Sequence, residues 1–121
     1  MPHRILVVED DEFLRELMKL ALEMDDYHVE AAEHGGKAME MITRSPPDAV
    51  ISDLEMPIVD GIHLLHWLRE EAGLGIPVLV LTARNAQHAM EDARRAGANE
   101  VLIKPVAMPR ILERLADLLK D

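Results

Sequence analysis

Five short apolar segments, separated by longer stretches with helical periodicity, constrain the fold of this chain more than any other feature. Most of them are continuously apolar, which is typical of strands that are covered on both faces of a sheet. The second segment is weaker and more polar, so we expect it at an edge of the sheet. The predicted strands are residues 4–9, 28–32, 49–53, 77–82 and 100–104.

The stretches between these strands carry apolar residues at the spacing of one helix face. In the first stretch Leu14, Met18 and Leu22 follow one another at intervals of four residues. In the last, Pro109 stands where the first turn of a helix accepts proline. The predicted helices are residues 12–24, 36–44, 61–71, 86–96 and 109–120.

Strict alternation of strands and helices implies right-handed crossovers and a parallel sheet. For five strands and five helices we expect an α/β fold, a flavodoxin-like doubly wound sheet with strand order 2-1-3-4-5. A chain of 121 residues has the size of one domain, so residues 1–121 are predicted to form a single domain. This strand order places the carboxyl ends of the first and third strands side by side.

Composition excludes several classes of function. The chain has no cysteine, which excludes disulfides, zinc–thiolate sites and thiol nucleophiles. A net charge of −10 argues against direct binding of nucleic acid, and the scarcity of aromatic residues argues against base stacking. We see no signal peptide and no apolar run near the roughly 20 residues of a membrane span, so we expect a soluble, cytoplasmic protein without a membrane partner.

Polar residues follow four of the predicted strands, and they form one chemical set. Ligands in open α/β sheets bind at the carboxyl ends of the strands, so these side chains are expected to share one edge. Two carboxylates about 4 Å apart repel by roughly 4 kcal/mol at an effective dielectric near 20, and a bound cation can offset this. Hard oxygen ligands with room for water favour Mg²⁺. The residues are Glu9, Asp10 and Asp11 after the first strand, Asp53 at the end of the third, Thr82 and Lys104.

A carboxylate beside Mg²⁺ can attack a phosphoryl group, and Asp53 is the candidate nucleophile. The transferred group would carry negative charge on three oxygens, of which Mg²⁺ could bind one, Lys104 another and the Thr82 hydroxyl a third. Asp11 has an alternative role as the cap of the first helix. That role does not account for Asp53, which precedes a loop.

The chain resembles the receiver domains of response regulators over nearly its whole length. The resemblance rests on Ile5-Leu6-Val7-Val8-Glu9-Asp10-Asp11, Asp53-Leu54-Glu55-Met56-Pro57 with Asp60-Gly61, Leu81-Thr82-Ala83 and Lys104-Pro105, all in order at similar spacing. It implies that Asp53 is the phosphoacceptor, that Thr82 is the switch hydroxyl and that Lys104 contacts the phosphoryl group. It also implies a cis bond between Lys104 and Pro105.

The same resemblance implies a set of Mg²⁺ ligands. Asp10 and Asp53 would bind the ion directly, Glu9 mostly through water, and Glu55 through its backbone carbonyl. Asp11 is a third acid with a less defined role.

By the same resemblance, a sensor histidine kinase or a phosphotransfer protein donates the phosphoryl group from a phosphohistidine. The receiver is then no enzyme acting on other molecules, because it catalyses only its own phosphorylation and dephosphorylation. Phosphorylation would shift a two-state equilibrium read by a downstream effector protein or by a C-terminal output domain outside this sequence. A stand-alone receiver and the N-terminal part of a longer regulator both fit. Family dimers often use the fourth helix, fifth strand and fifth helix, so a homodimer through this surface is also open.

Two features depart from the family pattern. Val101 stands where receivers usually carry Tyr or Phe, so it either fills the core or leaves the output to loop and backbone shifts. Glu55 and Arg84 each lie two residues after a key position. These opposite charges could pair across the mouth of the pocket and set the phosphoryl lifetime, or they are exposed charges of little consequence.

Three rival functions remain. An Mg²⁺-dependent phosphatase with an aspartyl nucleophile would use Glu55 as its acid/base, but no substrate-binding cap is evident in the sequence. A degenerate receiver that serves only as a binding scaffold would not need the complete set of acids. A flavin-binding protein of this fold would need aromatics and a phosphate-binding loop where this chain has acids.

Overall fold

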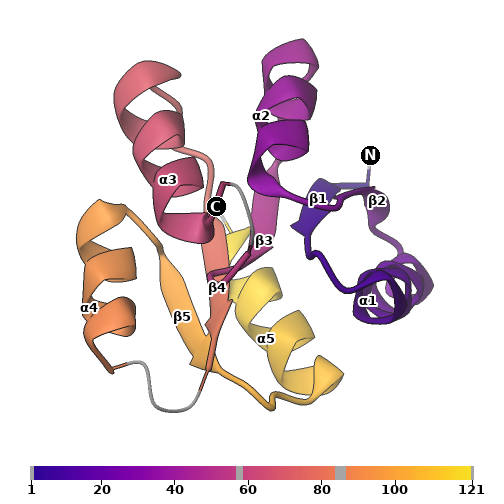
Figure 1. Ribbon diagram of the computed structural model, residues 1–121. Helices are drawn as coiled ribbons and strands as arrows, with labels where there is room; N and C mark the ends of the chain where they lie inside the picture. The colour runs from indigo at the N-terminus through magenta and orange to yellow at the C-terminus, as the bar shows by residue number, and fades with distance from the viewer. Residues whose placement is uncertain (1, 57–58, 84–86, 121) are drawn as a thin grey trace.

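The computed structural model describes residues 2–56, 59–83 and 87–120 and shows the predicted doubly wound parallel sheet (Figure 1). The strand order is β2-β1-β3-β4-β5, and each neighbouring pair is parallel, which confirms the predicted topology. The more polar segment forms β2 and lies at an edge, as expected. The strands are β1 (Arg4–Val8), β2 (His28–Ala32), β3 (Ala49–Asp53), β4 (Val78–Thr82) and β5 (Glu100–Ile103).

The helices cover both faces of the sheet, with α1 and α5 on one side and α2, α3 and α4 on the other (Figure 1). Four of the five helices lie within two residues of their predicted bounds. They are α1 (Glu12–Met24), α2 (Gly35–Arg44), α3 (Gly61–His66) with the π-helical turn η1 (Trp67–Glu71), α4 (Gln87–Ala96) and α5 (Met108–Leu118).

Alternate residues of each strand supply two separate cores. Leu6 and Val80 pack toward α2, α3 and α4, whereas Val7 and Leu79 pack toward α1 and α5. All four side chains are buried, because both faces of the sheet are covered. The continuous apolar runs in the sequence are therefore explained by burial on two faces.

The third helix differs from its prediction because its last turn is a π-helix. The Ala72 N–H donates to the Trp67 carbonyl over five residues, at 2.8 Å. The Arg69 guanidinium then reaches out of this turn to the Gly97 carbonyl and to Asn99 Oδ1, at 2.8 and 2.9 Å. Periodicity alone predicts one regular helix, and the structure differs from it in the turn from which Arg69 makes these long-range contacts.

The start of α3 lies directly against the end of β3. The Gly61 N–H donates to the Leu54 carbonyl at 2.9 Å, and a Cβ at Gly61 would lie 2.9 Å from the Asp53 carbonyl oxygen. Glycine is therefore required where this helix approaches the strand. Across the three described ranges, we find no helix with the length and hydropathy that a bilayer crossing needs.

Candidate functional site

Backbone hydrogen bonds continue past the strand ends and align the polar residues along one edge. The Glu9 N–H donates to the Ala32 carbonyl, and the Lys104 N–H donates to the Thr82 carbonyl at 2.7 Å. The residue after Asp53 donates its N–H across to β4 in the same way. The structure thus brings the residues that follow β1, β3, β4 and β5 to one edge of the sheet, as the sequence predicted.

Three carboxylates meet between β1 and β3. One oxygen each from Glu9, Asp10 and Asp53 lies within 4.8 Å of the others. Glu9 and Asp53 are only 3% and 4% exposed, whereas Asp10 is exposed to solvent. Burial removes the water that would otherwise screen their mutual repulsion.

This crowding raises the pKa of Glu9 from 4.5 to about 7. Burial contributes most to the rise, and the charge of Asp53 adds to it. The Asp11 N–H donates to Glu9 Oε2 at 3.1 Å and opposes the rise, because a hydrogen bond favours the charged carboxylate.

Lys104 compensates part of the negative charge. Its Nζ lies 2.8 Å from Asp53 Oδ1. The pKa of Asp53 is nevertheless raised, mainly because the carboxyl is buried; the ion pair with Lys104 opposes that shift, while the charges of Glu55 and Asp10 add to it. Burial lowers the pKa of Lys104, but its contacts with Asp53 and the charges of Glu9 and Glu55 outweigh burial and raise it.

Asp53 Oδ1 is buried and, among the described residues, receives no hydrogen bond of good geometry, although it has the close ammonium of Lys104. A buried, charged oxygen without a directed donor is costly to the fold. Its position beside two further carboxylates fits a hard cation, which accepts oxygen ligands from several directions. The cluster of Glu9, Asp10 and Asp53 could therefore hold a metal ion.

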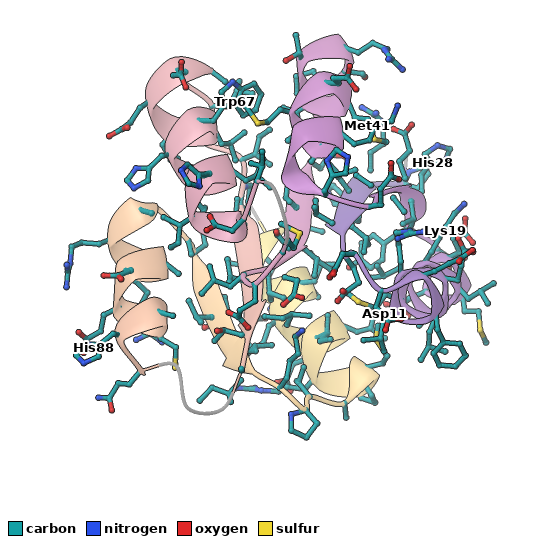
Figure 2. The ribbon with its side chains drawn as sticks, in the orientation of Figure 1. Asp11, Lys19, His28, Met41, Trp67 and His88 are labelled. Atoms are coloured by element: carbon teal, nitrogen blue, oxygen red, sulfur yellow. The ribbon has the colours of Figure 1, made fainter. Side chains whose placement is uncertain are left out.

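Asp11 has a different task from the other acids. Its Oδ1 accepts the Leu14 N–H at 3.0 Å, so it caps α1, and Figure 2 shows it where the chain enters that helix. The alternative role predicted for Asp11 is thus confirmed. The predicted roles of the Glu55 carbonyl and of water at Glu9 stay predictions.

The β4 side of the site is arranged differently. Thr82 is fully buried, and its Oγ1 donates to Glu55 Oε2 at 2.7 Å. The Ala83 N–H donates to Glu55 Oε1 at 3.0 Å. The contact between Glu55 and Thr82 was not predicted from the sequence, which suggested a pair between Glu55 and Arg84; Arg84 lies outside the described residues. One feature of the sequence could have indicated the contact: Glu55 follows β3, and the predicted strand order places β3 next to β4.

Val101 lies in the core on the α4 side, with only 5% of its surface exposed. Ala93 and Ala96 of α4 belong to the same buried cluster, so Val101 fills the space between β5 and that helix. The bond between Lys104 and Pro105 is cis, as the family resemblance implied.

Comparisons with known proteins agree with this geometry. The family model described as "Response regulator receiver domain" matches residues 5–116. The "Response regulator MprA" of Mycobacterium sp. (strain KMS) is 41% identical over 120 residues, which cover 99% of this chain and 52% of that protein. The chain therefore spans about half the length of this curated relative.

Two solved structures are similar over the whole chain. A putative response regulator from Chloroflexus aurantiacus J-10-fl has a TM-score of 0.92 at 33% identity and covers 98% of both chains. The chemotaxis response regulator CheY4 of Vibrio cholerae has a TM-score of 0.91 at 26% identity, covering 98% of this chain and 100% of that one. The chain belongs to the response regulator receiver domain family of two-component signalling.

Proposed function

We propose that this protein is a phosphorylation-driven switch in which Asp53 accepts a phosphoryl group from a phosphohistidine. The observation that carries the proposal is the buried Asp53 carboxylate, which lies beside Glu9, Asp10 and the ammonium of Lys104 at the carboxyl edge. Mg²⁺ is the proposed cofactor, because three clustered carboxylates with one exposed member suit a hard cation that keeps water ligands.

In the proposed reaction, an Asp53 oxygen forms a bond to phosphorus as the N–P bond of the donor breaks. The imidazole nitrogen of the donor keeps the bonding electron pair, and Asp53 becomes an acyl phosphate. Lys104 is placed to bind one phosphoryl oxygen as negative charge spreads over the transferred group. The bound Mg²⁺ would supply positive charge between the carboxylates and the phosphoryl oxygens. Water later cleaves the acyl phosphate, so the protein turns over only its own phosphoryl group.

The helix beside this site offers a docking surface for the donor. Phe13, Leu17, Leu20 and Met24 are 45–85% exposed and follow one another at intervals of four, three and four residues along α1. This spacing is typical of apolar residues at the interface between two packed helices. A cavity of about 490 Å³ adjoins the same helix, and Leu17, Lys104 and Pro105 are among its lining residues. We propose that a helix of a sensor kinase or phosphotransfer protein docks on this surface.

The output remains at the level of proposal. A cytoplasmic effector protein, or an output domain in a longer chain, would read the switched surface. A homodimer through α4, β5 and α5 stays a prediction. On this face Arg114 pairs with Glu100, and Arg95 lies near Glu91 and Asp92 of its own helix.

The proposal is tested by incubating the protein with acetyl phosphate and Mg²⁺ and measuring the intact mass. We expect one added phosphate that requires Mg²⁺ and is absent in Asp53→Asn. If wild type gives no adduct, beryllofluoride binding should be measured next, because a short-lived acyl phosphate escapes detection by mass. Failure to bind beryllofluoride in a folded protein would contradict the proposed function and favour the binding scaffold.

A further inference from the structure

The Glu55 side chain uses both of its oxygens on the β4 side of the site. Oε2 accepts the Thr82 hydroxyl at 2.7 Å, and Oε1 accepts the Ala83 N–H at 3.0 Å. A carboxylate held by two donors at once is a strong, charge-assisted contact. Thr82 has no exposed surface, so its hydroxyl depends on a protein acceptor or on a bound group.

These two donors suit an anion with two oxygens in a fixed geometry, which describes a phosphoryl group as well as a carboxylate. In the proposed function, the Thr82 hydroxyl turns to a phosphoryl oxygen on Asp53. Asp53 is the last residue of β3, and Glu55 lies two residues later in the loop that follows, so the competing carboxylate is close in sequence to the phosphoacceptor. The same hydroxyl proton cannot be donated to both acceptors.

We propose that Glu55 is a built-in competitor of the phosphoryl group, holding Thr82 and Ala83 until phosphorylation of Asp53 displaces it. This proposal rests on the proposed function and adds the residue that sets how readily phosphorylation of Asp53 switches the protein. Glu55 acts here as a positioning residue, since it touches the donors and not the reacting phosphorus.

The exposure of Glu55 makes such a displacement feasible. Glu55 is an exposed residue, although its carboxylate contacts the buried hydroxyl of Thr82. Once released, the carboxylate can exchange its two protein donors for water, so it is not left buried and unpaired.

The test measures the dissociation constant of beryllofluoride by calorimetry, in the presence of Mg²⁺, for wild type and two variants of Glu55. Glu55→Ala removes the competitor, and we expect binding to tighten about tenfold, the scale of one charge-assisted hydrogen bond. Glu55→Asp keeps the charge but is one methylene shorter, so it cannot span both donors. The Glu55→Asp variant should therefore bind beryllofluoride nearly as tightly as Glu55→Ala.

Comparing Glu55→Ala with Glu55→Asp distinguishes the effect of the two hydrogen bonds from the effect of negative charge. If Glu55→Asp binds beryllofluoride like wild type and only Glu55→Ala binds more tightly, general charge repulsion explains the effect and the proposal is wrong. If wild type binds beryllofluoride and neither variant differs from it, Glu55 does not compete. A merely structural role predicts weaker binding in both variants, which is the opposite sign.

A second readout uses the donors themselves. In the Thr82→Ala background, the gain from Glu55→Ala should shrink, because one of the two contested donors is gone. An undiminished gain would show that Glu55 does not act by holding Thr82, and the proposal would be wrong. Wild type that binds no beryllofluoride and forms no acyl phosphate would contradict the proposed function instead, so the two failures are distinguishable.

Discussion

The two halves of the site, on either side of Asp53, differ in how their charges are satisfied. On the β1 side three carboxylates crowd together, the pKa of Glu9 rises to about 7, and a buried oxygen of Asp53 has no directed hydrogen bond among the described residues. On the β4 side the carboxylate of Glu55 is matched by two donors, the Thr82 hydroxyl and the Ala83 N–H.

The comparison shows that negative charge is concentrated on the β1 side, whereas on the β4 side the Glu55 carboxylate is already hydrogen-bonded within the chain. Unmatched negative charge calls for a cation, because each carboxylate without a partner costs stability. Matched donors resist a second anion, because the new ligand must first break existing hydrogen bonds. In the proposed function a phosphoryl group would contact both sides of the site, which would link cation binding to the displacement of Glu55.

Removing the lysine that pairs with Asp53 should have the largest effect. Lys104→Ala deletes the ammonium that lies 2.8 Å from Asp53 Oδ1. We expect phosphorylation by acetyl phosphate to slow about 100-fold, the usual loss when one charged donor is removed from a transferred group. The rate is followed by intact mass, with Lys37→Ala in α2 as a control for lysine removal. Equal rates in the two variants would contradict the role of Lys104.

The three carboxylates on the β1 side should make the metal-free protein less stable as the pH rises. The pKa of Glu9 is higher in the folded protein than in the unfolded chain, so the folded state holds a proton that the unfolded state releases. This contribution is present below pH 4.5 and is lost as the pH rises to about 7. We expect a loss of about 2–3 kcal/mol in the free energy of unfolding.

Urea unfolding in EDTA, at about pH 5 and about pH 8, measures this loss. Glu9→Gln should flatten the pH dependence, and added Mg²⁺ should recover stability at the higher pH. Glu16→Gln, an exposed glutamate of α1, is the matched control and should behave as wild type. A Glu9→Gln protein with the wild-type slope would show that the crowding has no energetic consequence.

A larger side chain at position 101 should destabilise the core between β5 and α4. Val101→Tyr forces a ring into the core between β5 and α4, and overpacking of this kind costs about 2 kcal/mol. Chemical unfolding measures that cost, with Val101→Ile as a control of closer volume. If tyrosine is accommodated without loss, this side of the core has spare space and an aromatic switch could operate in it.

The smallest effect is expected at Asp11, which lies beside the crowded half without belonging to it. Asp11→Ala removes the cap of α1 and should cost about 1 kcal/mol of stability, with little change in Mg²⁺ affinity. Asp11→Ser should restore the cap. A marked loss of Mg²⁺ affinity in both variants would instead make Asp11 a metal ligand.

Most of the fold was predictable, because the strands are buried on two faces and therefore read as continuous apolar runs. The π-helical turn after His66 was not predictable, because local periodicity indicates one regular helix and gives no sign of the contacts of Arg69 with the distant Gly97 and Asn99. The crowded half of the site was also predictable, since Glu9, Asp10 and Asp53 follow directly from strand ends. The matched half was not, because the direction of the Glu55 side chain is set by the neighbouring strand.

We propose that a cation enters the β1 side of the site freely, whereas a phosphoryl group must open the β4 side by displacing Glu55. This proposal is tested most directly by following backbone amide signals by NMR while adding first Mg²⁺ and then beryllofluoride. We predict that Mg²⁺ alone shifts the signals of Asp10, Asp11 and Asp53 and leaves Ala83 unchanged, and that beryllofluoride then shifts Ala83. A shift of Ala83 on Mg²⁺ alone, equal to that with beryllofluoride, would contradict the account.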